Sequence, residues 1–343
     1  MNKYVLSITT FLFSTGAIAQ NKPAPLVDSV KNYLDSTFSI IQRNALNKSK
    51  VNWPLLKQTV YEKAAGATTY EDILPLYSYI FEQLDDHHGM LKFKNKSYYW
   101  NGNDTPVPNQ ILTQAIAKYK EPVAQTIGKN IGYILIPGND DFSSKRIDSI
   151  TAAIKKEIAK VSSKNIKGWI IDLRNNTGGN MYPMIAGLSK LIGDGKAGSF
   201  VSPEGVSSDS WSIKDGALFY ETTRVSAVEN QGYPVPLNIP LVILIGNYTA
   251  SSGEMTAISI KGRKNAVLIG EPSAGYTTVN TGFRLNSYSG LNLAIAYAAD
   301  RNDQLYPKRI TPDIMVKGGD NFEKLTEDLK IKQAVYWLKK HSL

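Results

Sequence analysis

The chain has 343 residues, of which 42% are hydrophobic, so it can bury a sizeable core, and its length suggests about two domains. The formal net charge is +9, but acidic residues interrupt the basic ones throughout, which disfavours a nucleic-acid-binding protein. The chain contains no cysteine, which excludes disulfides, thiol nucleophiles and thiolate metal sites.

Residues 1–19 have the pattern of a secretory signal peptide. Lys3 precedes an apolar run over residues 5–13, and the small residues Ala17 and Ala19 predict cleavage before Gln20. The apolar run is too short to span a bilayer, and no later stretch reaches the necessary length. We therefore expect an exported protein, periplasmic or extracellular, with no membrane-spanning segment after cleavage.

Residues 20–92 are predicted to form a small helical subdomain. Apolar residues recur at helical spacing between residues 25 and 67 and again over residues 70–84. One of these helices is expected to begin at Asn52-Trp53-Pro54, because Asn52 is a good cap and Pro54 fits a first turn. The subdomain ends in the polar segment Asp85-Asp86-His87-His88-Gly89.

Residues 93–343 are predicted to form an α/β core. Residues 93–108 are typical of a loop or hairpin. Strand-like apolar runs at 130–137, 168–174, 241–245 and 266–271 then alternate with helix-like segments, and an amphipathic helix closes the chain. This alternation predicts a mostly parallel sheet with right-handed crossovers. Residues 193–238, rich in Gly, Ser and aromatic residues, are expected to form an irregular excursion that covers a site.

Ser251 lies where a buried strand turns into a helix. The apolar run ends at Ile245, helical spacing resumes at Met255, and a helix start directs free N–H groups at its turn. The segment Thr249-Ala250-Ser251-Ser252-Gly253 keeps the second glycine of the Gly-x-Ser-x-Gly nucleophile elbow but not the first. The alternative is that Ser251 or Ser252 only caps the helix, with Glu254 completing a capping box.

A serine nucleophile needs a base, and the chain has three histidines. His341 is close to the C-terminus and is a poor candidate, which leaves His87 and His88, of which at most one can face a site. Two alternatives stay open for this pair. Both residues are ordinary polar positions, or they bind a metal together with Asp85 and Asp86, although the spacing is not that of a two-histidine helical site.

A second polar turn follows the strand that ends near residue 174. Its sequence is Asn175-Asn176-Thr177-Gly178-Gly179, at the carboxyl end of a strand, where α/β folds place ligands. An N–H group of this turn could join the N–H of Ser252 in an oxyanion hole. Alternatively, the two glycines only permit a tight turn.

Five segments of the chain follow one another in a recognisable order, namely Gly132-Tyr133-Ile134, Ile171-Asp172-Leu173-Arg174-Asn175-Asn176-Thr177-Gly178-Gly179, Thr249-Ala250-Ser251-Ser252-Gly253-Glu254, Gly270-Glu271-Pro272 and Thr311-Pro312-Asp313-Ile314. Their order and approximate spacing are those of the S41 peptidases, so the chain resembles that family over roughly residues 25–340. The resemblance implies a core with a crotonase- or ClpP-like spiral. It also implies Ser251 as nucleophile, and an oxyanion hole from the N–H of Ser252 and that of Gly178 or Gly179.

The departures from the family pattern indicate the branch. Tyr276 stands where the processing proteases of the family have a catalytic lysine. The sequence is similar instead to the tricorn-like branch, in which a histidine of the N-terminal helical region is the base, and the match selects His88. That branch also implies an orienting acid, for which Asp300 is the candidate. The interval between Gly89 and Asn130 is too short for the PDZ domain that family members often carry there.

These observations predict an exported serine peptidase that acts on peptides or proteins without a metal or other cofactor. A catalytically inactive protein that uses the same fold to bind a peptide or a hydrophobic ligand is the alternative. A lipase or esterase is disfavoured, because the order His, Ser, acid differs from the Ser, acid, His order of α/β-hydrolases. The sequence does not predict an oligomeric state.

Overall fold

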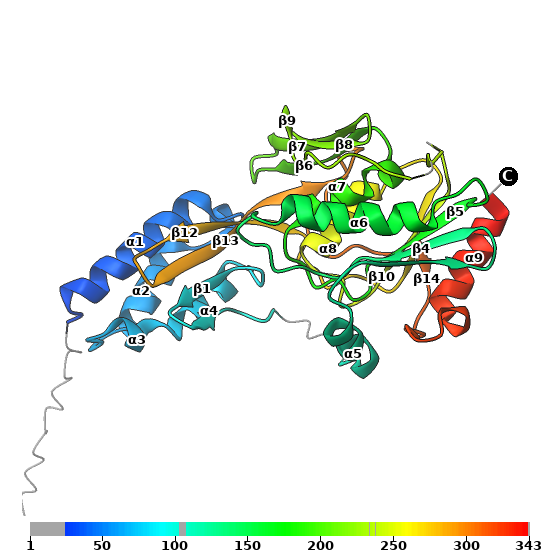
Figure 1. Cartoon of the computed structure of the whole chain (residues 1–343). Helices are drawn as coiled ribbons and strands as arrows, with labels where there is room; N and C mark the ends of the chain where they lie inside the picture. Colours follow the sequence, from blue (N-terminus) through cyan, green and yellow to red (C-terminus); the bar gives the residue numbers. More distant parts are fainter. Residues whose placement is uncertain (1–24, 103–107, 233, 237, 342–343) are drawn as a thin grey trace, which may run out of the picture.

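The computed structural model describes residues 25–102, 108–232, 234–236 and 238–341, so the predicted signal peptide lies outside the described residues. The α-helices of the described chain, shown in Figure 1, are α1 (Asp28–Asn44), α2 (Trp53–Lys63), α3 (Tyr70–Ile73), α4 (Leu76–Gln83), α5 (Gln110–Lys118), α6 (Ile147–Val161), α7 (Met181–Ile192), α8 (Ser252–Ile260) and α9 (Leu329–His341). Two 3₁₀ turns, η1 (Lys48–Lys50) and η2 (Leu325–Glu327), complete the helical elements.

A mostly parallel sheet forms the centre of the fold, as the sequence predicts. Its strands, in spatial order, are β14 (Ile314–Met315), β11 (Ala266–Gly270), β10 (Leu241–Ile245), β5 (Gly168–Asp172), β4 (Ile131–Leu135) and β3 (Val123–Ile127). Only the pair β3–β4 is antiparallel among the described strands of this sheet. Every residue of β4, β5 and β10 is buried, which explains why these strands read as continuous apolar runs.

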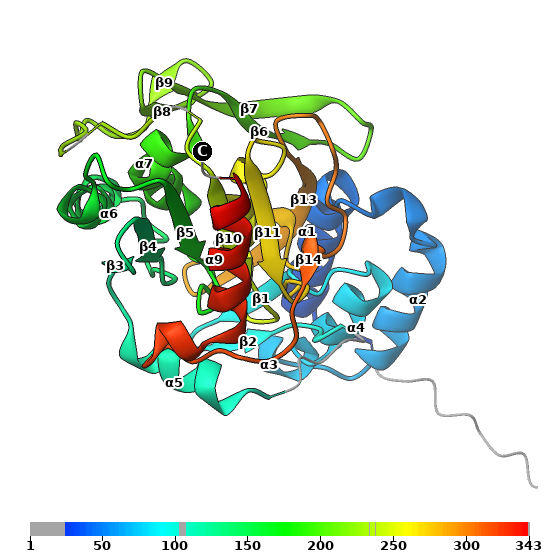
Figure 2. The same cartoon turned by 90° about the vertical axis from the view of Figure 1, so that its right-hand side faces the viewer.

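Helices cover both faces of this sheet. Ile171 and Ile243 point to one face and join a core with apolar residues of α6, α7 and α8. Val242 and Leu244 point to the other face, where they pack with α9 residues such as Leu338. Figure 2 shows α9 lying across β5, β10 and β11 on that second face.

A second, antiparallel sheet corrects the prediction for residues 193–238. Its strands are β1 (Met90–Phe93), β2 (Lys96–Tyr98), β6 (Gly195–Val201), β7 (Ser207–Lys214), β8 (Ala217–Tyr220), β9 (Thr223–Arg224), β12 (Thr278–Arg284) and β13 (Ser289–Ala299). The expected irregular excursion was wrong for residues 195–224, where β6 to β9 form. Register shifts in the β6–β7 pair break the alternation that identifies a strand, and the second partner of β6 is the distant β13. The hairpin expected after residue 93 corresponds to β1 and β2.

The N-terminal helices share a hydrophobic core with this second sheet. Val30, Leu34 and Phe81 pack in one cluster with Leu91 of β1 and Leu291 of β13. Figure 1 shows α1 to α4 at the end of the molecule into which β12 and β13 extend. This cluster joins residues from both sides of residue 92, so it does not separate the helical subdomain from the core. The predicted boundary at residue 92 stays a prediction.

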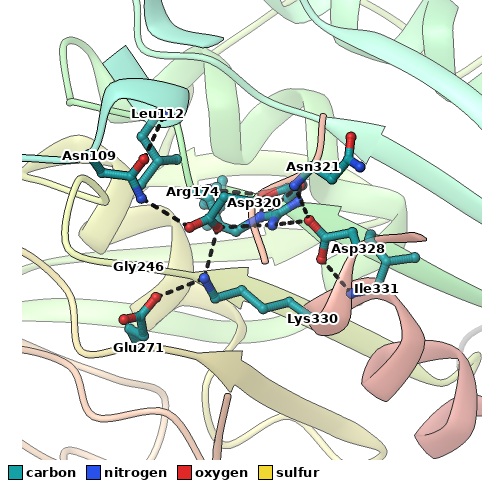
Figure 3. Close-up of polar contacts among 12 residues, drawn as sticks. Asn109, Leu112, Arg174, Gly246, Glu271, Asp320, Asn321, Asp328, Lys330 and Ile331 are labelled. Carbon is teal, nitrogen blue, oxygen red and sulfur yellow. Dashed lines mark hydrogen bonds and ion pairs between the residues drawn. The ribbon is translucent and has the colours of Figure 1, made fainter. Parts of the chain in front are cut away.

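A buried ion-pair network lies at the carboxyl ends of the parallel strands (Figure 3). The Arg174 guanidinium donates to Asp172 through Nε and Nη2, and to Asp320 and Asp328 through Nη1, and both partners of each pair are almost fully buried. Lys330 Nζ, at the start of α9, bridges Asp320 and Glu271. Arg174 directly precedes the glycine turn and Glu271 follows β11, so the network connects the ends of two strands to the C-terminal segment.

Candidate active site

Ser251 has the strained backbone of a nucleophile elbow. It is the N-cap of α8 with φ 51° and ψ −116°, a region that residues with a side chain rarely adopt. Its N–H donates to Glu254 Oε2 at 2.8 Å, and the two residues form the capping box that the sequence suggests. A simple N-cap has an extended backbone and needs no positive φ. The capping alternative is therefore correct as a description of the contacts, but it does not explain the strain.

Hydrogen bonds hold the turns that follow the parallel strands together. Ala250 N–H donates to the carbonyl of Asn176, and Thr249 Oγ1 donates to the carbonyl of Leu173. On the other side, Ala274 N–H donates to the carbonyl of Thr249. The turn with Ser251 is thus fixed between the glycine turn after β5 and the segment after β11.

Gly178 and Gly179 lie against the Ser251 turn. A Cβ atom on Gly178 would stand 3.0 Å from the Cβ of Ser251, and one on Gly179 would stand 1.9 Å from the carbonyl oxygen of Asn139. Both glycines also have positive φ, so these positions require glycine. The alternative of a merely tight turn does not account for such close approach to Ser251.

Only one of these two glycines offers its amide to a ligand. Gly178 N–H donates to Asn176 Oδ1 at 3.0 Å, whereas no acceptor in the described chain takes the Gly179 N–H. The N–H of Ser252 is the first of α8 and has no partner within the helix. Ser252 Oγ donates to the Gly179 carbonyl at 2.6 Å and so ties the two candidate oxyanion donors together.

His88 lies in a turn that a buried carboxylate holds. Asp86 accepts hydrogen bonds from the N–H groups of His88, Gly89 and Ala294. His88 Nδ1 is 2.9 Å from Thr278 Oγ1, and the ring packs at 5.1 Å from that of Tyr276. Burial of the imidazole and the neighbouring His87 lower the pKa of His88 to about 4, so its ring is neutral at physiological pH.

Glu254 and residues 273–278 connect the serine turn to the histidine turn. Glu254 Oε1 accepts from Ser273 Oγ and from Gly275 N–H, while the Gly275 carbonyl lies 2.9 Å from His87 Nε2. Burial raises the pKa of Glu254 to about 7 despite these donors. Thr249 and Glu254 of the serine turn and the two histidines thus contact the same short segment, but the described structure contains no hydrogen bond between His88 and Ser251.

Asp300 makes its hydrogen bonds inside its own turn. Oδ1 accepts from the N–H groups of Asn302 and Gln304, and Oδ2 accepts from the Tyr306 hydroxyl at 2.8 Å. None of the hydrogen bonds of the described residues joins Asp300 to His88, so its role as orienting acid stays a prediction. The group that does contact His88 Nδ1, Thr278, was missed, because nothing in an isolated threonine indicates a partner so far along the chain.

A cavity of about 400 Å³ opens beside His88. Ser251 does not line it, but His87, His88, Tyr276 and Thr278 do. The rest of the wall includes two further aromatic rings and three cationic side chains, namely Trp100, Tyr297, Lys50, Lys308 and Arg309. Among the described residues, the carboxylates and histidines here do not form a group that could hold a metal ion.

The comparisons with known proteins identify the family. The model of peptidase family S41 matches residues 130–316, which include the Ser251 turn and both glycines but not His88. The chain belongs to peptidase family S41. The resemblance of the five motifs and the expected fold class are thereby confirmed.

Curated relatives of this S41 chain are similar at low identity. The nisin-resistance protein of Lactococcus lactis subsp. lactis is 26% identical over 291 residues, which cover 84% of this chain and 80% of that protein. The chloroplastic carboxyl-terminal-processing peptidase 2 of Arabidopsis thaliana is 28% identical over 185 residues, 53% of this chain and 31% of the relative. The carboxy-terminal-processing protease of Bartonella bacilliformis is 27% identical, and 45% of its length is matched. This chain thus spans less than half of these two processing peptidases.

Solved structures share the fold. A lipoprotein from Streptococcus agalactiae superposes with a TM-score of 0.69 at 22% identity, covering 95% of this chain and 99% of the other. The photosystem II D1 C-terminal processing protease gives a TM-score of 0.56 at 16% identity, covering 84% and 93%. Among the described residues of this S41 chain, no helix has the length and apolar character needed to cross a membrane.

Proposed function

We propose that this S41 family member is an exported serine peptidase with Ser251 as nucleophile and His88 as general base. The observation that carries the proposal is the strained Ser251 turn, held at the start of α8 against two glycines that could not carry side chains. Family membership supports peptides or proteins as substrates. Export rests on the predicted signal peptide, and a mature protein that begins at Gln20 would support it.

The proposed reaction uses the groups of the serine turn, the glycine turn and the histidine turn. His88 Nε2 takes the proton of Ser251 Oγ as that oxygen bonds to the peptide carbonyl carbon. The carbonyl oxygen becomes an oxyanion that the N–H groups of Ser252 and Gly179 stabilise, each worth about 3 kcal/mol in the transition state. The C–N bond then breaks, His88 returns the proton to the leaving amine, and water hydrolyses the acyl-enzyme by the same steps.

Substrate binding has to bring His88 and Ser251 into contact, because they share no hydrogen bond in the described structure. Catalytic hydrogen bonds often form only in the complex with substrate. The cavity beside His88, with its aromatic and cationic wall, is the proposed place for a peptide segment that carries a carboxylate. Lys50, Lys308 and Arg309 line its wall together with two carboxylates, of which that of Asp86 is bonded to backbone N–H groups.

Labelling with a fluorophosphonate tests the proposed nucleophile. We expect one modified residue, Ser251, with labelling abolished in Ser251→Ala and strongly slowed in His88→Ala. Ser252→Ala is the matched control, since it removes the neighbouring hydroxyl but keeps the backbone N–H, and it should still be labelled. Modification at Ser252, or labelling that persists in Ser251→Ala, would contradict the assignment.

A non-catalytic binding protein is the second candidate, and the missing contact between His88 and Ser251 favours it. The cavity beside His88 is large enough for one or two side chains of a peptide. Turnover of a peptide library that disappears in both Ser251→Ala and His88→Ala would exclude this candidate. Saturable peptide binding without turnover, unchanged in Ser251→Ala, would favour it instead.

A further inference from the structure

We propose that Thr278 and Asn280 form a neutral relay that positions the His88 imidazole, in the place where a carboxylate is expected. The inference rests on the proposed function, since it concerns the tautomer that a general base needs. Thr278 and Asn280 are positioning residues in this proposal, because they act on His88 and do not touch the reacting atoms.

Three hydrogen bonds close a ring that begins and ends at His88. His88 Nδ1 lies 2.9 Å from Thr278 Oγ1, and Thr278 Oγ1 donates to Asn280 Oδ1 at 3.4 Å. Asn280 Nδ2 donates to the backbone carbonyl of His88 at 2.7 Å. Thr278 therefore holds the side chain of His88, and Asn280 holds its main chain, both from β12.

The chemistry of these groups sets the direction of every bond in the ring. A backbone carbonyl only accepts, so the group of Asn280 that faces it must be the NH₂, and Oδ1 must face Thr278. The single proton of the Thr278 hydroxyl then goes to Oδ1, and its oxygen accepts from His88 Nδ1–H. A neutral imidazole has one N–H group, so Nε2 keeps its lone pair. That is the tautomer able to take a proton from Ser251.

Strand β12 holds the two positioning residues in place. Both are half-buried, and the pairing of β12 with β13 shifts register between Val279 and Asn280. Such a bulge re-aims side chains at the point where it occurs. The ring of Tyr276 also packs edge-on against the imidazole. Rotation of the imidazole is therefore opposed by a hydrogen bond and by a ring contact.

A neutral relay differs from an acid in one measurable way. It selects the tautomer but supplies no negative charge to stabilise the imidazolium. The other titratable groups near His88 are His87, Tyr276 and Asp86, with Asp85, Lys50, Lys308 and Arg309 around the cavity. None of these groups is described as bonded to Nδ1. A carboxylate placed at residue 278 should therefore raise the pKa of His88 above its present low value.

The rate of fluorophosphonate labelling of Ser251 tests the relay in the full chain. Thr278→Val keeps the shape but removes the hydroxyl, and we expect labelling to slow by about 10²-fold, the low end of a general-base contribution. Thr278→Ser should restore most of the rate. Thr278→Asp should shift the acid limb of the pH profile upward. Thr281→Val, an exposed position on the same strand, is the control and should label like the wild type.

Nitrogen-15 spectra of the imidazole rings provide a readout that does not need activity. The chain has only three histidines, so the His88 signals can be assigned with a His88→Gln variant. We expect the Nδ1–H tautomer in the wild type and in Ser251→Ala, and loss of that preference in Thr278→Val. An Nε2–H tautomer in the wild type, or wild-type labelling of Thr278→Val, would overturn the relay. Absence of labelling in the wild type would defeat the proposed function alone, since the tautomer would still be measured.

Discussion

Two ionisable residues of the candidate site, the half-buried His88 and the buried Glu254, have pKa values shifted in opposite directions. Burial lowers the pKa of His88 to about 4 and raises that of Glu254 to about 7, because in each case the low-polarity surroundings disfavour the charged form. The neutral form of His88 is the one that a base needs. Glu254 instead accepts hydrogen bonds from Ser251 N–H and Gly275 N–H, so its charge affects how firmly the serine turn is held.

Glu254 should make the protein less stable as the pH rises from 4.5 to about 7. Over this interval the folded state holds a proton that the unfolded state has lost, so stability present below 4.5 is lost as the pH rises through the folded pKa. The loss is about 3 kcal/mol for a shift of this size. Urea unfolding at several pH values gives the free energy of unfolding as a function of pH for the wild type and for Glu254→Gln, and the difference between the two curves measures the loss. His88 contributes equally to both curves. Parallel curves would contradict the prediction.

The turns at the carboxyl ends of the parallel strands, rather than the strands themselves, decide what the site can do. Three of these turns meet, and their contacts are made mainly by backbone groups, so their shape depends on where glycine is present. Gly178 is the clearest case, because the backbone of one turn rests on the side chain at the centre of another.

Gly178→Ala should separate backbone strain from contact with Ser251. Gly195 has a similar positive φ, 116° against 110°, but a Cβ there would meet no atom within 4 Å. Both alanine variants should lose about 1 kcal/mol or more of stability through strain. Only Gly178→Ala should also slow fluorophosphonate labelling, because its Cβ displaces Ser251. Equal labelling rates in the two variants would show that the close approach has no role in the site.

On the scale of the whole molecule, the buried network around Arg174 joins parts of the chain that are far apart in sequence. Figure 3 shows Asp320, Asp328 and Lys330 from the C-terminal segment converging with Arg174 and Glu271. These charged side chains, except that of Glu271, are almost fully buried. Each buried charge therefore needs its ion-pair partners to offset the free energy that it loses on leaving water. The C-terminal helix α9 therefore takes part in holding the strand ends that carry the site.

Arg174→Leu should destabilise the protein by about 3–5 kcal/mol, since it leaves buried carboxylates without their cation. Arg224→Leu is the matched control, because Arg224 pairs with Glu229 on the surface, where an ion pair contributes little. Urea unfolding midpoints of the two variants provide the comparison. A midpoint for Arg174→Leu close to that of the control would mean that the network is not needed for stability.

The sequence by itself determined the parallel core and the serine turn. Strands such as Leu241–Ile245 are buried on both faces, so their apolar runs are visible locally, and the glycines at 178 and 179 indicate a turn after another such run. Family motifs added the choice of Ser251 and His88, which remain predictions.

Only the tertiary structure decided the antiparallel sheet and the contacts of the polar groups. Thr278 lies 190 positions from His88, and β12 carries it there by pairing with β13, which in turn pairs with β1 next to the histidine turn. Asp300, selected from the sequence as the acid, instead bonds within its own turn. Local periodicity reports which residues are buried, whereas the partner of a hydrogen-bonding group depends on long-range strand pairing, which no short stretch of sequence encodes.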